Sequence, residues 1–180
     1  MSVTPIRLFG DPILRTKAEL VVDFDNELRK LVSDLTDTML AAPGAGLAAP
    51  QIGVSARVFT YNIDGEIGHM VNPVIEQVSD ETQDGNEGCL SIPGISVPCI
   101  RPMRTRAVGF NQYGEPIVVD AEQTLARAVL HEVDHLDGVL FVDRLDGPTR
   151  KAAMKAIRES EWANQPIPRV KVSPHGPFGA

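Results

Sequence analysis

The segment ARAVLHEVDHL, residues 126–136, constrains the fold of this chain more than any other. Apolar residues recur around it at the spacing of one helix face: Leu125, Val129, Val133 and Leu136. Residues 121–136 are therefore expected to form a helix with a buried side, capped by Asp120 with Gln123 three residues on. A helix that buries polar residues must give them partners, which limits what can pack around it.

The polar residues of this segment have the spacing of a metal site. His131 and His135 are four residues apart, so their rings project from one helix face about one turn apart. Glu132 is rotated away from them and can reach a water molecule near the metal. This HExxH arrangement supplies two ligands and a general base, because a metal lowers the pKa of a bound water towards ~7. The alternative is an ordinary helix with polar surface residues.

A catalytic metal needs a third protein ligand and an open position. The best candidate is Cys89 in NEGCLSIPG, residues 86–94, because a thiolate binds iron or zinc strongly. Its alternative role is that of a small buried apolar residue, which we assign to Cys99. His175 lies in a Pro/Gly-rich tail and Glu159 and Glu161 in a separate helix, so they suit the site less well.

The rest of the chain predicts an α+β fold, with mainly antiparallel sheets around the central metal-binding helix. An N-terminal helix is expected at residues 25–42, capped by Asp25 or Asn26, and a C-terminal helix from Gly147 to about Trp162. Four strands are expected between these helices, at 56–63, 70–78, 105–112 and 116–121. Residues 1–165 are predicted to form one catalytic domain, and 166–180 a mobile tail.

Composition excludes several classes of protein. The net charge of −7 argues against a general nucleic-acid coat protein, and we expect no DNA partner. There is no run of about 18 apolar residues for a membrane span and no recognisable signal peptide. Two cysteines are too few for a disulfide framework. A cytoplasmic location without a membrane partner is therefore expected.

Three motifs, in order, resemble those of peptide deformylases. GAGLAAPQ at 44–51 fits the first, glycine-rich motif of that family, EGCLS at 87–91 the second, and HEVDH at 131–135 the third. The resemblance runs from about residue 10 to about residue 162. It implies a deformylase-like fold with a zincin-like active-site helix. It also implies an enzyme that removes the formyl group from formyl-methionyl nascent peptides and releases formate.

The resemblance also implies roles for single residues. Cys89, His131 and His135 would bind one divalent metal, usually ferrous iron in this family, although zinc, nickel or cobalt would suit the ligands. Glu132 would be the general base and then the acid. The side-chain amide of Gln51 and the backbone N–H of Leu90 would hold the oxygen that becomes negative. A further set would line the substrate site: Ala45, Gly46 and Gly88.

The methionine side chain of such a substrate requires an apolar pocket, and Val129 is expected either to help line it or to be an ordinary core residue. Three features depart from the family pattern. Leu130 stands where glutamine is frequent, and no basic residue follows Pro93 before Arg101, although many bacterial members have one that contacts substrate. The tail from Pro166 has no counterpart in the family core.

In the family that these motifs resemble, a C-terminal helix can dock on the ribosome. The resemblance thus implies phosphate contacts for the basic residues of the last helix here, and the alternative is a solvated face: Arg150, Lys151, Lys155 and Arg158. Two other functions compete with deformylation. A zinc endopeptidase would use the same helix with a different third ligand. A deformylase-like binding module would hold a structural metal with four protein ligands.

Overall fold

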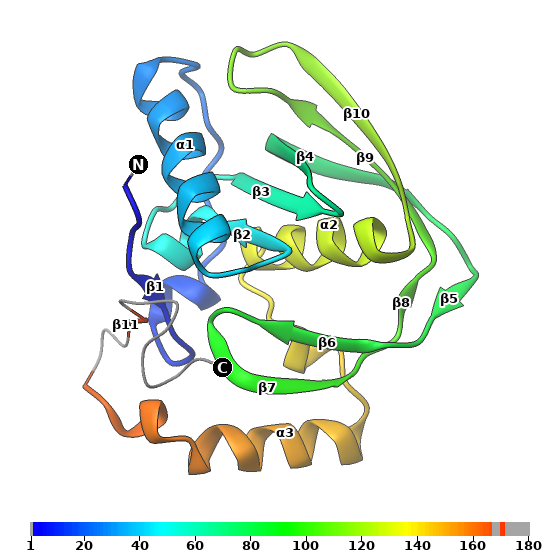
Figure 1. Cartoon of the computed structure of the whole chain (residues 1–180). Helices are drawn as coiled ribbons and strands as arrows, with labels where there is room; N and C mark the ends of the chain where they lie inside the picture. Colours follow the sequence, from blue (N-terminus) through cyan, green and yellow to red (C-terminus); the bar gives the residue numbers. More distant parts are fainter. Residues whose placement is uncertain (1, 167–169, 172–180) are drawn as a thin grey trace.

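A five-stranded antiparallel sheet forms the centre of the computed structural model, which describes residues 2–166 and 170–171 (Figure 1). The strand order is β10-β9-β4-β3-β2. The sheet strands are β2 (Gly46–Ala48), β3 (Val58–Ile63), β4 (Glu66–Val78), β9 (Arg104–Phe110) and β10 (Pro116–Glu122). The four strands expected from alternation are confirmed, and β4 begins four residues before its expected start at residue 70.

Helix α1 (Asn26–Ala41) begins and ends where its sequence predicts. The Asp25 side chain caps it by accepting hydrogen bonds from the backbone N–H groups of Glu27 and Leu28. Its apolar face packs on β2 and β3 in a cluster that includes Leu35 and Met39, both without exposed surface. This packing fixes the position of the loop that follows α1 and leads into β2.

Helix α2 (Gln123–Leu136) carries the HEVDH segment and runs through the middle of the molecule (Figure 1). The sheet packs against it with an apolar cluster that includes Phe59, Met70 and Val129. The expected cap by Asp120 is wrong. Asp120 lies within β10, paired with Arg106 of β9, because the strand leads directly into the helix. Glu122 occupies the N-cap position and makes no side-chain cap bond.

A β-hairpin on the other side of α2 was not expected from the sequence. It consists of β6 (Asn86–Cys89) and β7 (Ile92–Pro98), and its outer side is covered by α3 (Gly147–Glu159). Helix α3 ends three residues earlier than predicted, since Ser160 is extended. Trp162 lies instead in a 3-10 turn, Glu161–Asn164, and its indole N–H donates to the Pro93 carbonyl at 3.2 Å. The tryptophan thus anchors the hairpin.

Short elements complete the described structure. They are β1 (Ile6–Arg7), β5 (Thr82–Gln83), β8 (Arg101–Pro102), β11 (Val170–Lys171) and 3-10 turns at Pro12–Arg15, Ala49–Ile52 and Phe141–Asp143. Most of the predicted tail lies outside the described residues, but β11 belongs to it and pairs with β1. The predicted α+β class, with antiparallel sheets around a central helix, is confirmed. Within the described residues, every helix is too short or too polar to cross a membrane.

Candidate metal centre

Three side chains converge where the end of β6 meets α2. The thiol of Cys89 and ring nitrogens of His131 and His135 all lie within 4.8 Å of one another. The Nε2 atom of His135 is 3.2 Å from the Cys89 sulfur and 3.2 Å from Nε2 of His131. Helical i,i+4 spacing brings the two rings together, and an irregularity in the β6–β7 pairing at Cys89 brings the thiol to them.

The three groups suit a divalent cation. Metal bonds of 2.0–2.3 Å in a tetrahedral site place neighbouring ligand atoms roughly 3.5 Å apart, close to the observed separations. Burial opposes protonation of both rings, yet hydrogen bonds that the ring of His131 can donate to Cys89 and Glu87 raise the pKa of His131. Burial and nearby His131 lower the pKa of His135. A metal would bind the deprotonated ring nitrogens and the thiolate, so its binding would displace protons from these three groups.

Glu87 orients the first histidine. Its Oε1 atom lies 2.7 Å from Nδ1 of His131, which leaves Nε2 facing the other ligands. Arg101 binds the same carboxylate through two nitrogens at 2.6 and 3.0 Å, and Arg127 adds a third contact at 3.0 Å. Burial would raise the pKa of Glu87, but the bonds to Arg101 and His131 hold it far below its usual value. The sequence offered no sign of this network beyond the position of Glu87 in EGCLS.

Arg101 is itself a buried part of the scaffold. Its Nη1 donates to Asp134 at 2.8 Å, and Arg144 donates to both oxygens of the same carboxylate at 2.6 and 3.1 Å. Only 4% of Arg101 is exposed. Burial would lower the pKa of its guanidinium, but the hydrogen bonds and negative charges of Glu87 and Asp134 hold that pKa above the usual value. The first basic residue after Pro93 is therefore a structural cation and does not face substrate.

Glu132 lies beside the ligands with little access to water. Only 3% of the residue is exposed, and its Oε2 atom has no hydrogen-bond partner among the described residues. Burial raises the pKa of the carboxyl to about 7, with His131 opposing and Glu87 adding to the shift. Gly46 is required next to it, since a Cβ atom at that position would lie 2.3 Å from Oε1. A carboxyl with such a pKa can both accept and return a proton near neutral pH.

Hydrogen bonds hold the side chain of Gln51 in a fixed orientation next to the Cys89 thiol. Its Oε1 atom accepts from the backbone N–H of Ala48 at 2.8 Å. Its Nε2 atom donates to the Ser91 hydroxyl at 3.1 Å and lies 3.6 Å from the Cys89 sulfur. Although glutamine is commonly exposed, this side chain is 1% exposed. The amide N–H₂ group is thereby directed towards the candidate metal centre.

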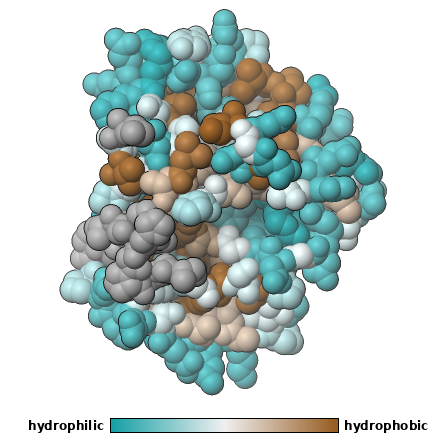
Figure 2. Space-filling model, viewed as in Figure 1, coloured by the Kyte–Doolittle hydropathy of each residue, from teal (hydrophilic) through white to brown (hydrophobic). Residues whose placement is uncertain are grey.

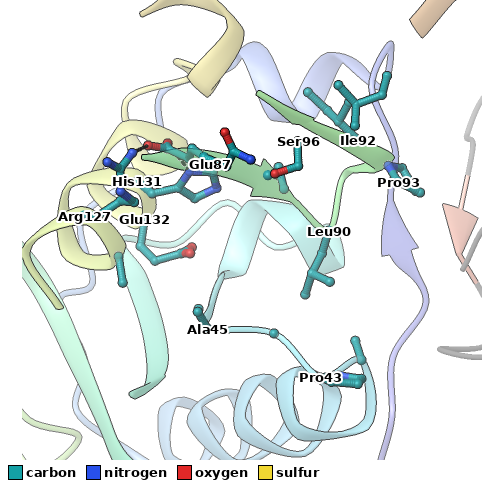
Figure 3. Close-up of a pocket in the computed structure, with 18 of the residues that line it drawn as sticks. Pro43, Ala45, Glu87, Leu90, Ile92, Pro93, Ser96, Arg127, His131 and Glu132 are labelled. Atoms are coloured by element: carbon teal, nitrogen blue, oxygen red, sulfur yellow. Dashed lines mark hydrogen bonds and ion pairs between the residues drawn. The ribbon is translucent and has the colours of Figure 1, made fainter. Parts of the chain in front are cut away.

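A cavity of about 860 Å³ opens onto these residues. In Figure 3, Glu132 extends into it from α2, with Ala45 and Leu90 facing it from the other side. Gly46, Gly88 and Gln51 also line the cavity. All the residues that we expected to contact substrate therefore line it, except Val129. Figure 2 shows the mixed hydrophobic and polar surface that surrounds this part of the molecule.

Val129 lies elsewhere. It has no exposed surface and packs in the core between α2 and the sheet, while its neighbour Ala128 lines the cavity. The helix face that carries Ala128 and His131 faces the cavity, and Val129 is rotated by about 100° from Ala128. We therefore do not assign Val129 to the substrate pocket.

The ligand set distinguishes between the functions considered above. Among the described residues, Cys89, His131 and His135 form the only group of three or more such side chains that could hold a metal. A zinc endopeptidase would need a third ligand other than Cys89, and a closed structural site would need a fourth. The fold and site thus fit a metal-dependent enzyme of the HExxH type in which Cys89 is available as the third ligand.

Comparison with known proteins gives the same result. The family model "Polypeptide deformylase" matches residues 3–151. The chain is 63% identical to a peptide deformylase of Acidothermus cellulolyticus, over 97% of this chain and 96% of the other. It is 59% identical to one from a Parafrankia species, over 99% and 98% of the two chains. The crystal structure of peptide deformylase from Thermus thermophilus superposes with a TM-score of 0.82 at 43% identity, covering 87% and 93%.

The chain therefore belongs to the polypeptide deformylase family and is an enzyme. This family removes the N-formyl group from nascent peptides. The resemblance of the three motifs is thereby confirmed over most of the chain.

The two cysteines provide a direct test of the metal centre. Cys89→Ala removes one of three ligands, so affinity for a divalent cation should fall by more than about a hundredfold. Cys99→Ala is the matched control, since Cys99 is buried away from the three ligands and should leave affinity unchanged. Metal titration of both purified variants, with folding checked by circular dichroism, measures this. Equal affinities in the two variants would exclude Cys89 as a ligand.

Proposed function

We propose that this enzyme hydrolyses the N-formyl group of formyl-methionyl nascent peptides through Cys89, His131, His135 and Glu132. The observation that carries the proposal is the buried carboxylate of Glu132, whose Oε2 atom has no hydrogen-bond partner among the described residues. It lies next to three convergent ligands in an open cavity. A divalent cation held there would supply a Lewis acid and lower the pKa of water.

Residues of the chain would transfer the proton, stabilise the developing negative charge and make room for the substrate. Glu132 takes a proton from the attacking water and later delivers it to the departing amine nitrogen. The Gln51 amide and the backbone N–H of Leu90 donate to the formyl oxygen as it gains negative charge, each contribution being worth ~3–4 kcal/mol in comparable sites. Ala45, Gly46 and Gly88 allow the substrate main chain to approach closely. Addition of water and cleavage of the C–N bond give formate and a free amino terminus.

We further propose ferrous iron as the metal. One thiolate and two imidazoles form a ligand set that suits iron, and the family resemblance points to iron among the metals that such a set accepts. Zinc, nickel and cobalt suit the same donors.

Replacement of Glu132 by glutamine tests the assignment of the base. The variant keeps the size of the side chain but cannot take up the proton, so formate release from a formyl-Met tripeptide should fall by at least ~10²–10⁴-fold. Formate is measured with oxygen-free protein, and metal content is determined for both samples. Metal-loaded wild-type protein that released no formate would contradict the proposed function. Full activity in metal-loaded Glu132→Gln would contradict the role of Glu132.

The outer face of α3 is a second candidate for interaction. Ala153 and Ile157 face the hairpin, while the basic residues are exposed: Arg150, Lys151, Lys155 and Arg158. Arg150 lies 3.3 Å from Asp143 and Lys155 lies 3.8 Å from Glu159, so these two are partly neutralised. We propose that this face contacts ribosomal RNA phosphates, which would place the enzyme near emerging chains.

Charge reversal tests this contact. Lys151→Glu with Lys155→Glu should weaken ribosome co-sedimentation by about tenfold or more at low salt, because two phosphate contacts are replaced by repulsion. The double exchange to glutamine is the matched control for side-chain size and should have a smaller effect. Co-sedimentation unchanged by the double glutamate variant would show that this face is simply solvated.

A further inference from the structure

Ser91 lies at the tip of the β6–β7 hairpin and is buried beside the candidate metal centre. The two strands pair from Cys89 to Ile92, and Ser91 belongs to the two-residue turn between them. Serine is mostly found at the surface of proteins, yet Ser91 has no exposed surface. A hydroxyl that is buried in this way needs a hydrogen-bond partner, and the partner here is the side chain of Gln51.

The main chain of Ser91 fixes the position of its hydroxyl. Its carbonyl accepts a hydrogen bond from the backbone N–H of Phe9 at 2.8 Å, which holds the turn against the segment that follows β1 (Figure 1). Its backbone N–H donates to the Cys89 sulfur at 3.4 Å. The hydroxyl itself accepts from Nε2 of Gln51 at 3.1 Å. Of these three contacts, only the last depends on the serine side chain.

Two contacts fix the plane of the Gln51 amide. The backbone N–H of Ala48 donates to its Oε1 atom at 2.8 Å, and the Ser91 hydroxyl accepts one of the two hydrogens on Nε2. The contact with Ala48 determines which end of the amide carries the oxygen, but alone it would let Nε2 pivot about that bond. The hydroxyl of Ser91 removes this freedom, because it holds the other end of the amide.

The second hydrogen on Nε2 of Gln51 is available to a new acceptor. Nε2 lies 3.6 Å from the Cys89 sulfur, a longer contact than its bond to Ser91 at 3.1 Å. The longer contact is the one that is lost when a negatively charged oxygen forms nearby, because that oxygen is the stronger acceptor. The hydrogen bonded to Ser91 stays in place during this exchange. A donor that is held in this way needs no reorganisation when the charge develops.

We propose that Ser91 is a positioning residue for the reaction: its hydroxyl holds the Gln51 amide so that the remaining Nε2 hydrogen faces the formyl oxygen as that oxygen gains charge. The inference rests on the proposed function, which gives Gln51 this task. It also connects the two oxyanion donors, because Ser91 follows Leu90 directly in the same turn. The bonds made and broken in the substrate are unchanged.

Ser91→Ala removes the hydroxyl and keeps the backbone contacts of the turn. On formyl-Met-Ala-Ser with the full-length, metal-loaded enzyme, kcat should fall by about tenfold and KM should change by less than about twofold, because the oxyanion forms only in the transition state. Thr105→Val is the matched control. It removes a buried hydroxyl that donates to the Gln77 carbonyl and does not line the cavity, so both constants should equal those of the wild type.

A double-mutant cycle separates positioning of the amide from support of the turn. Gln51→Leu keeps the approximate size of the side chain but has no amide to position. In that background Ser91→Ala should lower kcat by less than about twofold, because its effect acts through the amide. If Ser91 only supports the turn and the N–H of Leu90, it lowers kcat equally in both backgrounds. That result would overturn the proposal, as would a kcat of Ser91→Ala equal to that of the wild type.

A spectroscopic measurement tests the contact without catalysis. Cobalt(II) suits the same ligands, and hydrogen bonds to a coordinating thiolate change how strongly it donates to the metal. In cobalt-loaded Ser91→Ala the released amide can turn towards Cys89, so the sulfur-to-cobalt absorption band should shift from its wild-type position. The double variant should show the band of Gln51→Leu alone. An unshifted band in Ser91→Ala would overturn the proposal.

Failure of the proposed function has a different signature. Metal-loaded wild-type enzyme that releases no formate would reject deformylation, and the position of the cobalt band would still report whether Ser91 holds Gln51. An active wild type, together with a Ser91→Ala variant that matches it in kcat and in the cobalt band, would reject only the role of Ser91. Circular dichroism of each variant confirms that the fold is retained.

Discussion

The buried carboxylate of Glu87 joins the hairpin that carries Cys89 to the helix that carries both histidines. It contacts His131, Arg101 and Arg127 at 2.6–3.0 Å, while only 4% of the residue is exposed. An ion pair this deeply buried contributes little net stability, but loss of one partner leaves an uncompensated charge and costs ~3–5 kcal/mol. The network therefore fixes the relative position of the two ligand-bearing elements.

The positions of Glu132 and Gln51 depend on close packing as well as on charge. Glu132 can lie beside the ligands only because residue 46 has no side chain, and Gln51 can face the thiol because Ala48 holds its oxygen. Both constraints come from one short segment between α1 and β3. The packing of α1 against the sheet thus determines the geometry of the reacting groups, although α1 contributes no ligand.

Local sequence patterns predicted the elements with strong periodicity and the ligands with fixed spacing. Helix α1, four strands and the HEVDH helix follow from hydrophobic repeats, and the ligand pair follows from i,i+4 spacing. Cys89 was a candidate ligand because a thiolate binds such metals strongly, whereas the role of Gln51 required the resemblance to a known family. The cap at Asp120 and the end of α3 were wrong, because pairing with β9 and the anchoring of Trp162 to Pro93 override local preference.

Features that depend on contacts between distant residues could not be predicted. Glu87 is 44 residues from His131 and 14 from Arg101, and no periodicity connects them. The lining of the cavity arises in the same way, because Arg127 of α2 and Asn86 of β6 border the same space only after α2 packs on the hairpin. Val129 lies in the core, whereas Ala128, one residue earlier on α2, lines the cavity. A shift of one residue along this helix is therefore enough to move a side chain from the cavity to the core.

X-ray absorption on protein purified without oxygen would test the central claim most directly. The account predicts an iron edge and a first coordination shell of one sulfur and two imidazole nitrogens, completed by a light atom. A shell without sulfur, or one with four protein ligands, would contradict the assignment of Cys89, His131 and His135 as an open catalytic centre.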